Sequence, residues 1–193
     1  MRKIIFVTLL MISCLNIKVY SQSRISIGAG YSNLFYLDNR YDYKLMYGVN
    51  VAASYRLSDR WSIISGIDMF YRQFKSPNIV FQFDVINPFY YEGFRQNARL
   101  YRIPFNVRFL ILKNEKFETH VSAGIDYLNG FVSEVKSNYF LRVQNGVTYD
   151  CGFDFKYLVT EKISTIARFR YSGKCSNING RSLIAGLGIG YSL

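Results

Sequence analysis

RSLIAGLGIGYSL, residues 181–193, alternates strictly between large apolar side chains and nearly bare positions. Its odd-numbered positions from 183 carry Leu, Ala, Leu, Ile, Tyr and Leu, whereas its even-numbered positions include Gly186, Gly188 and Gly190. A period of two residues predicts a β-strand with different surroundings on its two faces. An unpaired edge strand of this kind in water would promote aggregation. We therefore expect this strand to be paired on both edges, with its apolar face turned away from water.

Seven further segments alternate in the same way and with the same parity. The eight segments span 25–31, 47–57, 61–71, 101–111, 117–127, 147–157, 163–171 and 183–193. Their odd-numbered positions carry no charge, and only Ser65, Thr119 and Thr165 among them are polar. The even-numbered positions of these segments and their flanks carry charges: Arg56, Asp68, Arg72, Arg102, Arg108, Glu118, Asp126, Asp150, Asp154, Lys156, Arg168 and Arg170. Two faces this different cannot both contact water, nor both face a dry core.

Aromatic residues mark both ends of the apolar face. Tyrosines occupy one end of seven segments: Tyr31, Tyr47, Tyr71, Tyr101, Tyr127, Tyr149 and Tyr171. The other end carries Tyr55, Trp61, Phe117, Tyr157 and Tyr191. Two such girdles at the head-group levels are typical of transmembrane barrels. A soluble lipocalin-like barrel also alternates, but it gives no reason for the two aromatic levels.

The links between segments also favour a membrane barrel. Short links at 58–60, 113–116 and 160–162 alternate with longer ones around 36–44, 73–98, 129–143 and 173–180. This order is expected for short periplasmic turns and long extracellular loops. Backbone groups in hydrocarbon must all be hydrogen-bonded, so the last strand must pair with the first. The sequence therefore predicts an all-β fold, an eight-stranded antiparallel transmembrane barrel over residues 22–193.

The N-terminus has the pattern of a secretory signal peptide, which we expect to span residues 1–21. Arg2 and Lys3 precede a short apolar run, and Ser21 ends a suitable cleavage site. A lipoprotein alternative would make Cys14 the lipidated residue. Export places the barrel in the outer membrane of a Gram-negative bacterium. The formal net charge of +11 then favours anionic lipid and lipopolysaccharide as partners and argues against nucleic acid.

The interior of an eight-stranded barrel is just wide enough for side chains to fill it. Desolvated charges need partners, so the interior residues are expected to form a hydrogen-bonded ion-pair network with water in its gaps. Beside them, the glycines of the first and last strands are expected to provide room. A narrow channel for small anionic solutes is the alternative, because bases outnumber acids inside.

Few residues in the chain suggest catalysis. His120 and Ser122 form a His-x-Ser pair similar to that of outer-membrane lipid A deacylases, which keeps a lipid A-modifying enzyme as a second alternative. His120 is expected to point inward near the short-link end and to bond a carboxylate such as Glu118 or Asp150. One histidine and no close cysteine pair indicate no metal site and no cofactor. Cys151 is expected on the lipid face, too far from Cys175 for a disulfide.

The 73–98 link contains an alternating run at 79–85 and then aromatic residues. It is interpreted either as an extension of the flanking strands or as a surface that captures a protein or glycan ligand. The candidate recognition residues are Phe81, Phe83, Phe89, Tyr90 and Tyr91.

Four short motifs resemble those of the outer-membrane beta-barrel, porin-like family, and more loosely the OmpA/OmpX-type eight-strand barrels. They are Tyr101–Phe105, Ala123–Gly124, Ala167–Ser172 with Asn177–Ile178, and Gly190–Ser192. The resemblance implies insertion by the barrel-assembly machinery, and Leu193 departs from the family's usual final Phe or Trp. It implies no reaction and no catalytic residue. We therefore expect a monomeric, non-enzymatic barrel that acts structurally or through its extracellular loops.

Overall fold

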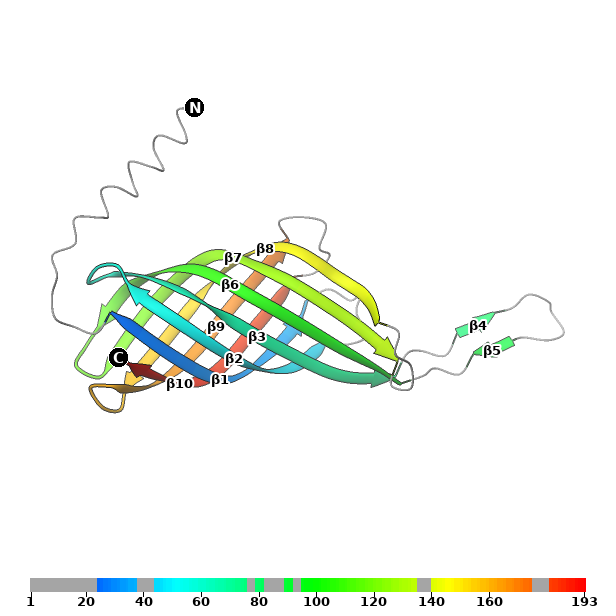
Figure 1. Ribbon diagram of the computed structural model, residues 1–193, viewed down its shortest axis with the longest axis horizontal. Coiled ribbons are helices and arrows are strands. Elements are labelled where there is room, and N and C mark those ends of the chain that lie inside the picture. The colour runs from blue at the N-terminus through cyan, green and yellow to red at the C-terminus, as the bar shows by residue number, and fades with distance from the viewer. Residues whose placement is uncertain are drawn as a thin grey trace, which may run out of the picture.

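A computed structural model describes residues 24–37, 44–75, 79–81, 89–91, 95–134, 140–174 and 181–193. Eight of its ten strands form one closed antiparallel barrel, in the order β1-β10-β9-β8-β7-β6-β3-β2 (Figure 1). The barrel strands are β1 (Ile25–Tyr36), β2 (Leu45–Arg56), β3 (Trp61–Lys75), β6 (Arg95–Lys113), β7 (Phe117–Glu134), β8 (Phe140–Leu158), β9 (Ile163–Lys174) and β10 (Ser182–Ser192). The predicted fold class is confirmed. No helix of membrane-spanning length and apolarity occurs in the described residues.

The last strand closes the barrel against the first. Gly28 pairs with Gly190 and Gly30 with Gly188, while the other edge of β1 pairs with β2. A Cβ added at Gly188 would lie only 2.7 Å from the backbone oxygen of Ala29. These glycines were expected to make room for long interior side chains. At Gly188 the reason is instead the close approach of the neighbouring strand's backbone, a position where glycine alone fits.

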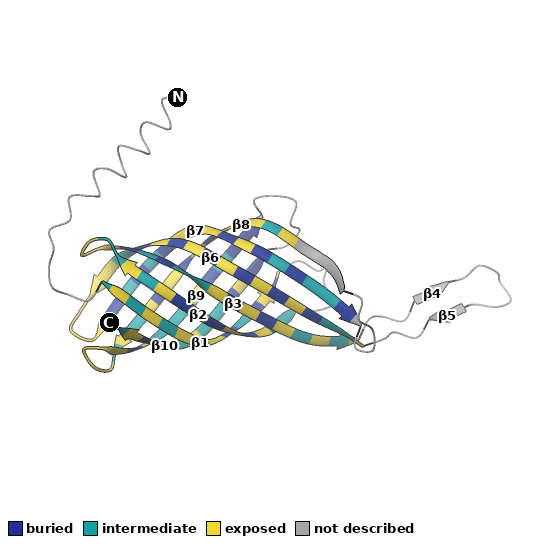
Figure 2. Ribbon diagram, viewed as in Figure 1, coloured by how far each residue is buried: buried dark blue, intermediate teal, exposed yellow. Residues whose placement is uncertain are grey.

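The two faces of the barrel strands differ as the alternation predicts. Odd-numbered side chains lie on the outside, where Leu187 is 71% exposed, and most even-numbered ones lie inside, where Asp126 and Asp154 are fully buried. Figure 2 shows this as alternating buried and exposed residues along each strand. The apolar coat is therefore outside and the charges are inside, the reverse of a soluble protein.

Several strands are longer than their alternating segments. β7 continues to Glu134 and β8 begins at Phe140, so the strands occupy most of the long link expected at 129–143. Irregularities between Leu110 and Leu112 and between Gly130 and Phe131 shift the pairing register. Such bulges change which face a side chain occupies, and for this reason Ile111 and Leu112 are both exposed.

The links gather at opposite ends of the barrel. The short links 57–60, 114–116 and 159–162 lie at the end that carries the C-terminus, which we call the short-link end (Figure 1). The strand ends that border the links 37–44, 76–94, 135–139 and 175–181 lie at the opposite end, which we call the long-link end. Within 76–94, β4 (Ile79–Phe81) and β5 (Phe89–Tyr91) pair as a separate two-stranded sheet. They are therefore not simple extensions of β3 and β6. The expected signal peptide, with Cys14, lies outside the described residues.

Candidate functional site

The centre of the barrel interior is organised around Arg102 on β6. Its Nε donates to Asp126 Oδ2 on β7 at 2.7 Å, and its two terminal nitrogens bind Asp68 on β3 and Asp150 on β8, each at 2.5 Å. Asp68 is also the direct cross-strand partner of Arg102. The Arg102 side chain is 1% exposed. One planar guanidinium thus holds carboxylates from three strands, a geometry that suits arginine and not lysine.

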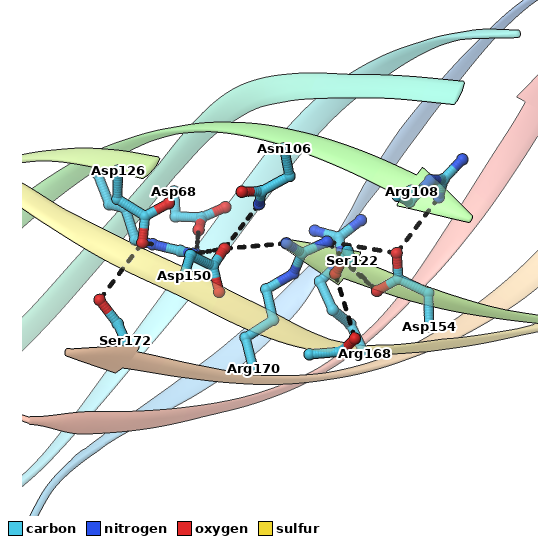
Figure 3. Close-up of polar contacts among 12 residues, drawn as sticks. Asp68, Asn106, Arg108, Ser122, Asp126, Asp150, Asp154, Arg168, Arg170 and Ser172 are labelled. Atoms are coloured by element: carbon cyan, nitrogen blue, oxygen red, sulfur yellow. Dashed lines mark hydrogen bonds and ion pairs between the residues drawn. The ribbon is translucent and has the colours of Figure 1, made fainter. Parts of the chain in front are cut away.

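A second node forms around Asp154 on β8. Arg108, Arg168 and Arg170 approach its carboxylate at 3.3, 3.5 and 3.3 Å. Arg170 also binds Asp150 at 2.9 Å and so joins the two nodes (Figure 3). We call the resulting group of four arginines and four aspartates the ionic network: Asp68, Arg102, Arg108, Asp126, Asp150, Asp154, Arg168 and Arg170. Its formal charges cancel, whereas the full set of predicted interior residues is basic.

Neutral polar groups and small cavities surround the ionic network. Asn106 Nδ2 donates to Asp150 Oδ2 at 2.6 Å, yet the second carboxylate oxygens of Asp126 and Asp150 have no partner among the described residues. Two cavities of about 20 and 30 Å³ lie beside the glycines of β1 and β10, and Arg168 lines both. Each is large enough for a water molecule. The charged side chains therefore fill the β3–β9 side, and the small gaps lie on the β10–β1 side.

The remaining predicted interior residues lie apart from the ionic network. Glu118 binds Lys156 at 3.2 Å and Lys113 at 3.7 Å near the short-link end. Arg72 donates to the backbone oxygen of Leu45 at 2.6 Å. Arg56 is half-buried near the short-link end of β2, where its backbone N–H donates to the oxygen of Arg24. The structure thus brings together eight of the twelve residues and places a smaller ion-paired cluster at one mouth.

His120 and Ser122 are both buried inside the barrel, at 7% and 2% exposure. His120 lies directly across from Asp154 in the strand pairing. Its Nδ1 has no hydrogen-bond partner in the described part of the chain, so this atom does not make the expected bond to Glu118 or Asp150. Ser122 Oγ donates to the backbone oxygen of Gly152 at 3.3 Å. Neither group faces the lipid, where a lipid A substrate would lie.

Sequence reasoning missed a second interior layer, which is apolar. It lies at the long-link end and consists of the buried residues Leu34, Tyr36, Met46, Phe70, Ala98, Leu100, Leu128 and Ile184. Phe74 and Val132 pack against it. We call this group the apolar layer. Its members occupy even-numbered positions, and six of the eight fall just beyond the alternating segments. The signal was therefore an apolar residue on the inward face close to the tyrosine end of a segment.

The predicted aromatic girdles lie on the outer surface. Eleven of their twelve residues are exposed, and Tyr171 is half-buried. At the long-link level, Tyr71 OH donates to Asn97 and Tyr127 OH to Asn145, both at 2.8 Å. At the short-link level, the rings of Phe117 and Tyr157 pack with centroids 4.9 Å apart. Each level therefore presents rings with a polar edge, as a head-group boundary requires.

The other predicted residues are placed only in part. Phe81 pairs with Phe89 and Ile79 with Tyr91 in the β4–β5 sheet, which also holds Tyr90. Phe83 lies outside the described residues. Cys151 is exposed on β8 and is a free thiol, and Cys175 also falls outside the described ranges. No cluster of three or more potential metal-binding side chains occurs among the residues described.

Comparison with known proteins places this barrel in a family. Residues 4–191 match the family described as outer membrane protein beta-barrel domain. A comparison with curated proteins gives no match. Among solved structures, Neisserial surface protein A is 15% identical, with a TM-score of 0.67 and coverage of 90% of this chain and 100% of that one. Ail, the attachment invasion locus protein of Yersinia pestis, is 17% identical, with a TM-score of 0.58 and coverage of 89% and 99%.

OprG from Pseudomonas aeruginosa is 12% identical, with a TM-score of 0.63 and coverage of 89% and 97%. At these identities the likeness to solved structures concerns the fold alone, and the family match carries the assignment. The chain therefore belongs to the outer membrane protein beta-barrel domain family, and it resides in the outer membrane of a Gram-negative bacterium.

Proposed function

We propose that this protein is a non-enzymatic surface protein whose barrel is a closed anchor and whose long links make the functional contacts. The observation that carries the proposal is the two-layer filling of the interior. An ion entering from the long-link end would first have to cross the apolar layer, in which Phe70 and Leu100 are each 2% exposed. It would then meet the ionic network, whose charges already neutralise one another.

The arrangement of charges also argues against the alternative of an anion channel. That alternative depends on an excess of interior bases. At the centre of the barrel the four arginines of the ionic network are matched by four aspartates, and the excess comes from Arg56, Arg72 and Lys156 outside the network. The cavities of about 20 and 30 Å³ each have room for one or two water molecules. They do not have the volume of a continuous solute path.

Planar-bilayer recordings test the closed interior. The refolded protein should give no steady conductance steps, while a wide diffusion porin reconstituted in the same lipid gives them. Reproducible steps from the wild-type protein would establish the small-channel alternative. Mass spectra of lipid A from cells with and without the protein test the enzyme alternative, and we expect identical acylation because His120 and Ser122 are buried.

The aromatic β4–β5 sheet supports a role in surface interaction. Its pairs Phe81–Phe89 and Val80–Tyr90 include three aromatic residues in a two-stranded sheet that is separate from the barrel sheet. Ail has been crystallised with the heparin analogue sucrose octasulfate, and an anionic glycan is a ligand class that we also propose for this basic chain. Removing residues 76–92 should abolish binding to surface proteins or glycans and leave the heat-modifiable gel mobility of the barrel unchanged. Binding that survives this deletion would place recognition elsewhere.

A further inference from the structure

A groove lies on the outside of the barrel at the long-link end, across β1, β2, β3 and β6. Its volume is about 420 Å³, and tyrosines of the girdle form its walls: Tyr31, Tyr47, Tyr71 and Tyr101. Gly48 and Val49 line it between them, and Arg99 is its one charged residue. We call this site the tyrosine groove. Its lining is mostly apolar and aromatic, and its charged edge is formed by Arg99 next to the girdle tyrosines, which we expect at head-group level.

Arg99 is one of three exposed basic residues on the outer face of the barrel, which is otherwise mostly apolar. Lys75, Arg95 and Arg99 all occupy odd-numbered, outward positions at the long-link ends of β3 and β6. Arg99 pairs across the sheet with Tyr71, and Lys75 pairs directly with Arg95. Like charges directly opposite each other destabilise a sheet. Arg95 and Arg99 are four residue steps apart, which is about 14 Å along the strand, so the bases form two separate positive rungs.

The two ends of the barrel differ in which exposed charged residues they carry. Among the residues whose burial is described, the exposed acids Asp59, Glu115 and Glu161 all lie in the short links. Exposed charges at the long-link end are all basic in the same set: Lys44, Lys75, Arg95, Arg99 and Arg181. No described carboxylate pairs with Lys75, Arg95 or Arg99. The described residues at this end therefore place positive charge beside an apolar groove.

We propose that the tyrosine groove and its two basic rungs bind a phosphorylated glycolipid of the lipid A class from the outer leaflet. An acyl chain would lie along Val49 between the tyrosines, and phosphates would contact Arg99 and the Lys75–Arg95 rung. Guanidinium groups bind phosphate through paired charge-assisted hydrogen bonds. A soluble polyanion would leave the groove unfilled, and a neutral lipid would leave the three bases without a partner among the described carboxylates. Two rungs about 14 Å apart also suit a head group with two separated phosphates better than a glycerophospholipid with one.

The assignment rests on the proposed orientation, with the long-link end at the cell surface. Binding is measured on the full-length refolded protein in detergent by native mass spectrometry, with diphosphoryl lipid A, monophosphoryl lipid A and phosphatidylglycerol as separate probes. We expect the order of affinity to follow that order of probes. The combined substitutions Lys75→Gln, Arg95→Gln and Arg99→Gln should weaken binding of diphosphoryl lipid A by at least about tenfold, since each contact to phosphate is charge-assisted.

Matched variants test the contribution of the basic residues and that of the apolar groove separately. Lys116→Gln with Lys162→Gln removes exposed bases at the short-link end and should leave the affinity unchanged. Val49→Phe fills the groove without altering charge and should weaken lipid binding while the heat-modifiable mobility is retained. Unchanged affinity in the triple variant would overturn the proposal, as would equal binding of phosphatidylglycerol. Sulfated glycan that competes fully with lipid A would also overturn it, because the occupant would then be a soluble polyanion. None of these results bears on the conductance or loop-deletion experiments, so failure of this proposal is distinct from failure of the closed-anchor function.

Discussion

Replacing Arg102 with methionine should cost more stability than any other single change in the interior. Methionine has a similar length and no charge, so it leaves Asp68, Asp126 and Asp150 buried around a missing cation. Breaking one buried ion pair costs about 3–5 kcal/mol, because the remaining charge stays desolvated. Three pairs are lost here, but contacts that share one group are not additive. We expect a loss of about 3–5 kcal/mol in the free energy of unfolding.

The single tryptophan makes this loss measurable. Trp61 is 45% exposed on the outer face, so its emission shifts when unfolding in urea takes it from lipid to water. Lys162→Met, in an exposed short link, should change the unfolding free energy by no more than about 0.5 kcal/mol. Adding Asp126→Asn to Arg102→Met should recover part of the loss, because Arg102 is the only described ion-pair partner of Asp126. A loss below about 1 kcal/mol for Arg102→Met would refute a dry, mutually dependent ionic network.

Three further predictions concern the rest of the barrel. Leu100→Ala in the apolar layer should lower the unfolding free energy by about 2–5 kcal/mol in the same assay, since Leu100 is 2% exposed; a loss under 1 kcal/mol would mean that the layer is wet. Gly188→Ala should reduce the yield of the heat-modifiable folded form much more than Gly28→Ala, because the added Cβ lies 2.7 Å from the Ala29 oxygen in the first case and 3.2 Å from the Ile189 oxygen in the second. Equal yields would remove the close-approach explanation. With Cys14 and Cys175 replaced by serine, Cys151 should react with a lipid-soluble maleimide and resist a charged one, and the opposite preference would show that β8 is turned inside out.

The alternation of side chains made the strands and their faces predictable from sequence. Parity within a strand is a local property, so each odd-numbered residue could be assigned outward without knowing its neighbours. The ends of the strands were harder to predict from the sequence. Leu34, Leu100 and Leu128 continue the inward face beyond the girdle tyrosines, but in the sequence an inward apolar residue is read as the end of an alternating segment. The register shift between Gly130 and Phe131 also ends the simple parity.

The contacts of the ionic network could not be predicted from sequence. Arg102 and Asp150 are 48 residues apart and lie on strands separated by β7. Whether these two side chains meet depends on how far each strand is shifted relative to its neighbours, and that stagger is a property of the whole closed barrel. Sequence therefore supplied the inward residues, but only the closed barrel separates Arg56 and Arg72 from the eight residues of the network.

The two ends of the barrel interior are filled by different kinds of side chain. At the long-link end, Phe70, Leu100 and Ile184 are at most 3% exposed, so the apolar layer separates the network from the surface medium. At the short-link end, Glu118 binds Lys113, whose side chain is 52% exposed. The cavity of about 30 Å³ is lined by Lys156 and Arg108 and lies between this mouth and the Asp154 node. The more exposed charges therefore lie at the short-link end, while the apolar layer lies between the ionic network and the long-link end. Substitutions at the surface site can consequently change recognition without disturbing the charges that hold the barrel together.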